Sequence, residues 1–186
     1  GNASGTGDFT IAAPNSNTNR TLTLPDEAGT IATTAFVTNR LVQNLNVTTG
    51  AVATGTTVIP ADNTIPQITE GTQFMSLALT PTSATSLLEI LVVTYVIANA
   101  DVLVASCLFR DDVASALATG FVLDATNRGG ATILNYRMIA DTTSEIVFSV
   151  RAGGHTASTV TLNGQAGAAY YGGTFSSSIT IKEYAA

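Results

Sequence analysis

The chain has 186 residues, of which 45% are apolar and only 11% are charged, and its net charge is −6. This length and apolar content suit one domain with some residues to spare, and a surface so poor in charge must be polar mainly through Thr, Ser, Asn and Gly. Lys182 is the only lysine and the arginines form no run, which excludes the clustered cations that nucleic acids and anionic membranes require.

Residues 1–32 have the pattern of a fibre shaft built from short β-strands. Two pieces alternate polar and apolar residues, and they have the sequences FTI at 9–11 and TLTL at 21–24. Strands this short cannot bury a core alone, and an isolated hairpin is only marginally stable. We therefore expect other copies of the chain to complete this segment, and we predict a homotrimer.

Residues 33–48 are predicted to form a short helical neck. Apolar side chains recur there at helical spacing along one stripe, formed by Phe36, Val37, Leu41 and Leu45. A helix this short is marginal in isolation, so it packs either against its own domain or against its copies around a threefold axis. We favour the second arrangement, a three-helix neck with these four side chains at its centre.

Residues 49–186 are predicted to form an all-β head domain. Apolar or alternating stretches bounded by turn residues predict strands at 57–59, 74–79, 87–98, 102–110, 118–123, 132–139, 145–151, 159–162 and 176–184. About nine short strands without an intervening helix indicate a mainly β fold, a sandwich of the jelly-roll type.

The facing of several strands can be predicted from their alternation. Ile146, Phe148 and Val150 fall on one face, with Glu145, Ser149 and Arg151 on the other, and the last strand likewise places Ile179 and Ile181 inward. Residues 87–98 are almost continuously apolar, which predicts a strand buried on both faces.

Several stretches resemble the fibre proteins of tailed phages. The N-terminal ones are TIAAP at 10–14 and NRTLTLPDEAGT at 19–30, and IATTAFV at 31–37 resembles the short helix that often follows them. The stretches GTTVIP at 55–60, QITEGTQF at 67–74 and SITI at 178–181 resemble the C-terminal heads of such fibres. The resemblance implies a homotrimer that displays its head at the virion surface, although similar trimers also decorate capsids.

Side chains that could carry out catalysis are sparse, and we expect no enzyme activity, cofactor or metal site. His155 is the only histidine, and the sequence contains no Gly-x-Ser-x-Gly motif to place a nucleophile beside it. The acidic residues Asp111, Asp112, Asp124 and Glu145 could bind calcium or cleave a glycosidic bond, but solvated turns explain them more simply. Cys107 lies within an apolar strand and is expected to be buried and inert.

Polar and aromatic loop residues are the candidates for binding a receptor. Tyr170 and Tyr171 stand beside two glycines and suit the face of a sugar ring, Arg128 suits an acidic group, and His155 lies in a glycine-rich loop. The competing interpretation of the tyrosine pair is packing, with one ring turned inward and the other covering the sheet edge.

Together these observations favour a virion protein, the head of a trimeric tail fibre that attaches the particle to a glycan or protein of the host surface. The alternative is a trimer that decorates the capsid, where it would contact other virion proteins. A third hypothesis is a spike that degrades glycans. None of the three involves nucleic acid or insertion into a membrane.

Overall fold

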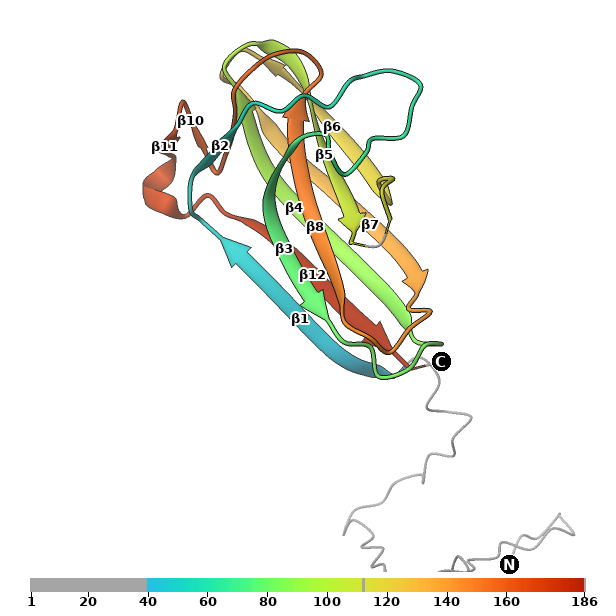
Figure 1. Cartoon of the computed structure of the whole chain (residues 1–186). Helices are drawn as coiled ribbons and strands as arrows, with labels where there is room; N and C mark the ends of the chain where they lie inside the picture. The colour runs from blue at the N-terminus through green and yellow to red at the C-terminus, as the bar shows by residue number, and fades with distance from the viewer. Residues whose placement is uncertain (1–39, 112, 186) are drawn as a thin grey trace, which may run out of the picture. The chain divides into compact units, whose positions relative to one another are not determined.

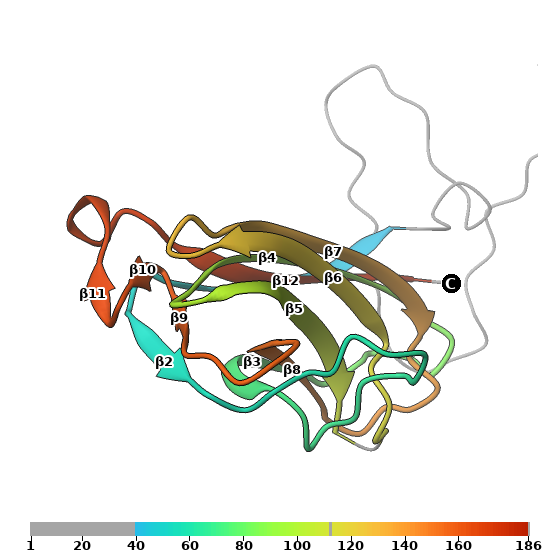
Figure 2. The same ribbon diagram turned by 90° about the horizontal axis from the view of Figure 1, so that it is seen from above.

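The computed structural model describes residues 40–111 and 113–185, which form a sandwich of two antiparallel sheets (Figures 1 and 2). The strands are β1 (Leu41–Thr49), β2 (Ala53–Gly55), β3 (Thr72–Leu79), β4 (Leu87–Ala98), β5 (Asp101–Arg110), β6 (Ala118–Ala125), β7 (Gly130–Ile139), β8 (Ile146–Gly154), β9 (Val160–Leu162), β10 (Gly164–Gln165), β11 (Ala168–Ala169) and β12 (Ser177–Tyr184). A short 3-10 turn, η2 (Tyr171–Gly173), precedes the last strand.

The eight long strands have the order of a jelly roll. The first sheet runs β1-β12-β4 with β7 on the other edge of β4, and the second runs β3-β8-β5-β6. Short β9 and β2 extend the first sheet, and β10 pairs with β11. Numbered by position in the chain, the long strands are therefore ordered 1-8-3-6 and 2-7-4-5, the double Greek key of a jelly roll. The predicted fold class is confirmed.

The core lies between the inner faces of the two sheets. Ile179 and Ile181 of β12 stand opposite Val92 and Ile90 of β4, and all four are 0% exposed. Phe148 of β8 closes the same cluster from the second sheet. The inward facing predicted for β8 and β12 is confirmed.

Three expectations about strands are corrected by the structure. Residues 57–59 are not a strand, and the short β2 lies just before them. The prediction that 87–98 is buried on both faces is wrong, because its outward residues are partly open and Leu91 is 39% exposed. Ser149 was placed on the solvent face of β8 but is buried, with only 3% of its surface exposed.

The predicted helical neck is wrong from Leu41 onward, where the chain forms β1. Leu45 stands opposite Ile181 of β12 and packs against the core, whereas Leu41 is 47% exposed. Residues 41–49 form a strand and not a helix because they pair with β12. This pairing places Leu45 and Val47, which alternate with a period of two, opposite Ile181 and Ile179. The head domain therefore includes β1 from Leu41 onward, while Phe36, Val37 and the expected shaft at 1–32 lie outside the described residues.

The connections between strands fall at the two ends of the sandwich. The end where the described chain begins and finishes also carries the turns at 80–86, 111–117 and 140–145. The opposite end, at the top of Figure 1, carries the turns at 99–100 and 126–129 together with the longer connections after β1 and β8. Within the described residues, no helix is long and apolar enough to cross a membrane.

Glu183 is a fully buried acidic residue on β12 whose carboxylate is enclosed by hydrogen-bond donors. Its Oε1 accepts hydrogen bonds from the backbone N–H and the hydroxyl of Thr82, at 2.7 and 2.6 Å, and its Oε2 accepts one from Gln43 Nε2 at 2.8 Å. Burial alone would raise the pKa of Glu183, but hydrogen bonds from these donors hold it below the ordinary value. The carboxylate thus joins β1, β12 and the 80–86 turn.

The position of Leu45 predicts that Leu45→Asp weakens the fold itself. A charge placed against the core should lower the free energy of unfolding by about 3 kcal/mol, as losses of apolar core contacts do. Asn44→Asp is the control, because Asn44 is exposed and stands opposite Lys182. Urea unfolding followed by circular dichroism measures both, and equal midpoints would contradict the strand assignment.

Glu183→Gln should lower the stability at neutral pH by about 1–3 kcal/mol, since hydrogen bonds to a buried charge are replaced by weaker ones. Because the folded-state pKa is lowered, the contribution of Glu183 is complete above its ordinary value of 4.5 and is lost as the pH falls through the folded-state pKa. The variant should therefore lose less stability than the wild type on acidification. Thermal melts between neutral and acidic pH test this, with exposed Glu145→Gln as the control.

Candidate functional site

The segment 56–71 runs across the outer face of the second sheet (Figure 2). Its start is held by a hydrogen bond from the N–H of Ile59 to the carbonyl oxygen of Gly154, at 3.0 Å. Gly153 permits this close approach, because a Cβ there would lie 2.4 Å from the carbonyl oxygen of Thr57. The glycines that end β8 therefore serve to seat this segment.

A small second core lies under the segment. Ile59 packs there with Cys107 and Phe109, two outward residues of β5, and all three are at most 2% exposed. Burial raises the pKa of the Cys107 thiol, which stays protonated. The expectation of a buried cysteine is confirmed.

Arg151 holds the far end of the segment to β8. Its guanidinium donates hydrogen bonds to the carbonyl oxygens of Glu70 and Gly71, at 2.9 and 3.0 Å. Gly71 has a φ of +65°, in the left-handed region that favours glycine, and this turn leads the chain into β3. The segment is thus anchored at both ends, and residues 66–68 are also held by backbone hydrogen bonds to Ala114 and Ala116.

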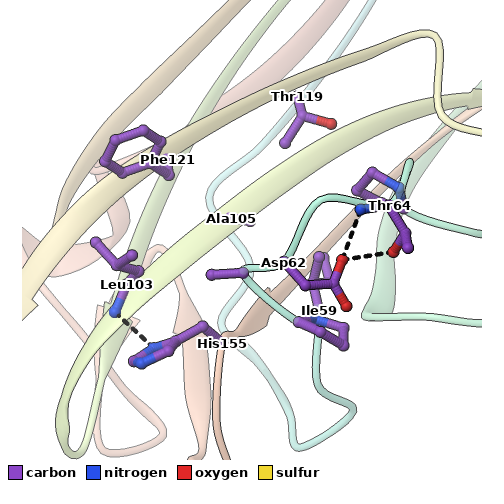
Figure 3. Close-up of a pocket in the computed structure, with 11 residues that line it drawn as sticks. Ile59, Asp62, Thr64, Leu103, Ala105, Thr119, Phe121 and His155 are labelled. Atoms are coloured by element: carbon purple, nitrogen blue, oxygen red, sulfur yellow. Dashed lines mark hydrogen bonds between the residues drawn. The ribbon is translucent and has the colours of Figure 1, made fainter.

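A pocket of about 430 Å³ opens between this segment and strands β5 and β6 (Figure 3). In Figure 3, Phe121 and Thr119 of β6 line one side, Asp62 and Thr64 the other, with β5 between them. The lining residues are Ile59, Pro60, Ala61, Asp62, Thr64, Pro66, Leu103, Ala105, Thr119, Phe121 and His155. Its size lies in the range of small-molecule sites, which combine apolar walls with a few polar groups.

Asp62 presents a carboxylate at the mouth of the pocket. Its Oδ1 accepts hydrogen bonds from the N–H and the hydroxyl of Thr64, at 2.8 and 2.5 Å. These bonds lower the pKa of Asp62, so the group is ionised at neutral pH. Its second oxygen, Oδ2, accepts no hydrogen bond from the described residues that would compete with a ligand.

His155 contributes a hydrogen-bond donor with a defined orientation. The ring Nδ1 accepts a hydrogen bond from the backbone N–H of Leu103 at 3.0 Å, while the backbone N–H of His155 donates to the carbonyl oxygen of Leu103 at 2.8 Å. Because Nδ1 is the acceptor, the neutral ring carries its hydrogen on Nε2. His155 was predicted to be a loop residue, and it lies directly after β8 in the wall of the pocket.

Phe121 supplies the aromatic surface of the pocket and is 69% exposed. Neither Phe121 nor Asp62 was chosen from the sequence. The signal for Asp62 was present, since an Asp followed two residues later by Thr is typical of a local side-chain turn. Phe121 lies between Gly120 and Val122, a context in which alternation does not distinguish the outward face.

The other predicted binding residues lie at the same end of the sandwich but not in the pocket lining. Arg128 is exposed in the β6–β7 turn, which is built around the buried carboxylate of Asp124. That carboxylate accepts hydrogen bonds from the N–H groups of Ala98, Arg128 and Gly129. Asp124 therefore shapes this turn, but the expectation that it is solvated is wrong, because its carboxylate is fully buried.

Tyr171 stands out from the connection before β12. It is 80% exposed and has a φ of +49°, uncommon for a residue other than glycine. Its ring lies 5.9 Å from that of Tyr170 and 6.3 Å from that of Phe175, and Phe175 in turn packs on Tyr95 at 4.3 Å. Tyr170 is partly buried in this cluster, whereas Tyr171 is exposed to solvent.

The fold brings two of the described acidic candidates together and places the third apart from them. Asp111 and Glu145 line a second pocket of about 200 Å³ at the end where the described chain begins, while Asp124 lies at the opposite end. The side chains of Asp111 and Glu145 are both exposed to solvent. Among the described residues, no group of three His, Cys, Asp or Glu side chains is placed to hold a metal ion, and Asp112 lies outside them.

The sequence matches no family model, and the search of curated proteins finds no relative. Among solved structures, the chain is similar to an Eiger TNF from S. frugiperda, at 11% identity and a TM-score of 0.47, with 76% of this chain and 93% of that chain covered. A latent PorU from Porphyromonas gingivalis matches at 8% identity and a TM-score of 0.36, covering 79% of this chain and 13% of that one. The VP2 protein of infectious bursal disease virus, from a subviral particle, matches at 11% identity and a TM-score of 0.34. The match covers 80% of this chain and 39% of that one.

Proposed function

We propose that this protein is a virion structural protein whose β-sandwich is the head of a trimeric tail fibre and attaches the particle to the host surface. The observation that carries the proposal is the arrangement of the connections. Arg128, His155 and Tyr171 lie at the end of the sandwich opposite to residue 40, where the preceding chain joins. A fibre that enters at residue 40 would present these side chains outward.

A rigid sandwich with exposed loops is the usual way to carry a binding surface. The pocket beside His155 and the strained, exposed Tyr171 both lie in the longer connections of this end. The resemblance of residues 10–30 to phage fibres supports the location on a virion. Attachment through three identical heads would convert weak single-site binding into strong adhesion.

The proposed trimer is supported by apolar side chains on the outer face of the first sheet. Leu91 of β4 is 39% exposed, and Ile133 and Ile139 of β7 are 66% and 45% exposed. A similar surface on a monomeric protein would leave apolar area in water, whereas copies around a threefold axis would bury it. The charged pair on the same face, Glu89 and Arg137, is already joined by a 2.8 Å salt bridge.

Ile133→Asp should therefore convert the protein from a trimer into smaller species, because it places an unpaired charge in the proposed interface. Sedimentation velocity of the full chain at micromolar concentration measures the change. Leu123→Asp is the matched control, since Leu123 is a 65% exposed apolar residue on β6 of the second sheet, outside the proposed interface. A wild-type chain that sediments only as a monomer would contradict the trimer.

Tyr171→Ala and Arg128→Ala should each weaken binding of the purified protein to host cells while changing the stability by less than about 1 kcal/mol, as for most exposed positions. Cell pull-down and thermal melts measure the two effects. Thr143→Ala, an exposed change at the opposite end, is the control. Protein that fails to bind host cells but binds empty capsids would overturn attachment in favour of capsid decoration.

A further inference from the structure

We propose that the pocket between segment 56–71 and strands β5 and β6 binds an uncharged sugar ring. This inference rests on the proposed attachment function and names the chemical class that the head would recognise. It is carried by three side chains brought together from distant parts of the chain, Asp62, Phe121 and His155.

The polar groups of the pocket match the hydroxyl groups of a sugar. Asp62 Oδ2 can only accept hydrogen bonds, and the Nε2–H of the neutral His155 ring can only donate one. A hydroxyl group both donates and accepts, so one ring with neighbouring hydroxyls satisfies the carboxylate and the imidazole together. Both groups are already oriented by the protein, Asp62 by Thr64 and His155 by Leu103, which reduces the entropy lost on binding.

The aromatic wall suits the apolar side of the same ligand. Phe121 is 69% exposed, although a phenyl ring gains by leaving water. Leu103 and Ala105 extend this apolar surface along β5. A pyranose ring presents C–H groups on its faces and hydroxyls around its edge, and it can therefore contact Phe121 and the two polar groups at once.

Ligands of other charge fit the pocket less well. An anion would be repelled by Asp62, and the lining includes no lysine or arginine to offset that repulsion. A cation would be attracted by Asp62 but would leave the donor hydrogen of His155 without an acceptor, and a wholly apolar ligand would bury the Asp62 carboxylate without a partner. A neutral polyhydroxylated ring avoids all three costs.

Saturation-transfer NMR of the full chain with the methyl glycosides of glucose, galactose, mannose and N-acetylglucosamine tests the proposal. At least one of them should bind, and N-acetylneuraminic acid, which is anionic, should not. Phe121→Ala and Asp62→Asn should each weaken the binding about tenfold or more, since one removes the stacking surface and the other the charged acceptor. Asp62→Asn keeps an oxygen to accept the hydrogen bonds from Thr64, so the local turn is retained.

Leu123→Ala is the matched control for Phe121→Ala, because Leu123 is the next outward residue of β6, is 65% exposed and does not line the pocket. Binding of none of the four glycosides, or binding equal in the pocket variants and the wild type, would overturn the sugar site. If host cells still bind the protein in that case, the attachment function is supported. Its ligand is then a protein, or it binds to the head outside this pocket. If a glycoside binds in the pocket but host cells do not bind the protein, the sugar site is supported and the attachment function is contradicted.

Discussion

The contact between the inner faces of the two sheets is the interaction on which the rest of this domain depends. Ile90, Val92, Ile179, Ile181 and Phe148 are fully buried there, and burying such side chains contributes about 1.5–3 kcal/mol each. Because successive side chains of a strand point to opposite faces, this burial also decides what faces outward. The exposure of Leu91, which lies between Ile90 and Val92, is a direct consequence.

The outer faces of the two sheets are used differently. Segment 56–71 covers part of the second sheet and buries Cys107 and Phe109, and beyond its edge it leaves a pocket with a carboxylate, an imidazole and an aromatic ring. The first sheet has no comparable cover over Leu91 and Ile133 among the described residues. Ligand binding and self-association can therefore occupy separate surfaces, and changes to one need not disturb the other.

The strands were predictable wherever alternation was clear and turn residues bounded it. For β8 and β12, both the strand and its inward face were predicted correctly. Ile146, Phe148 and Val150 repeat there with a period of two, as do Ile179 and Ile181. The strand at residues 41–49 was not predicted, because its sequence fits two patterns. Leu41 and Leu45 have helical spacing, while Leu45 and Val47 have the spacing of a strand. That choice depended on pairing with β12, which lies more than a hundred residues further along the chain.

The candidate site shows the same division. His155, Arg128 and Tyr171 could be selected as loop residues from their neighbours, since turn chemistry is local. That all three lie at one end, and that His155 alone of them meets Asp62 and Phe121 in a pocket, depended on the jelly-roll path and on the anchoring of segment 56–71. The sequence by itself thus determined which stretches are strands and which way many of them face, because alternation is written in adjacent residues. The tertiary structure decided which distant side chains meet, because strand pairing and loop docking join residues that no local pattern relates.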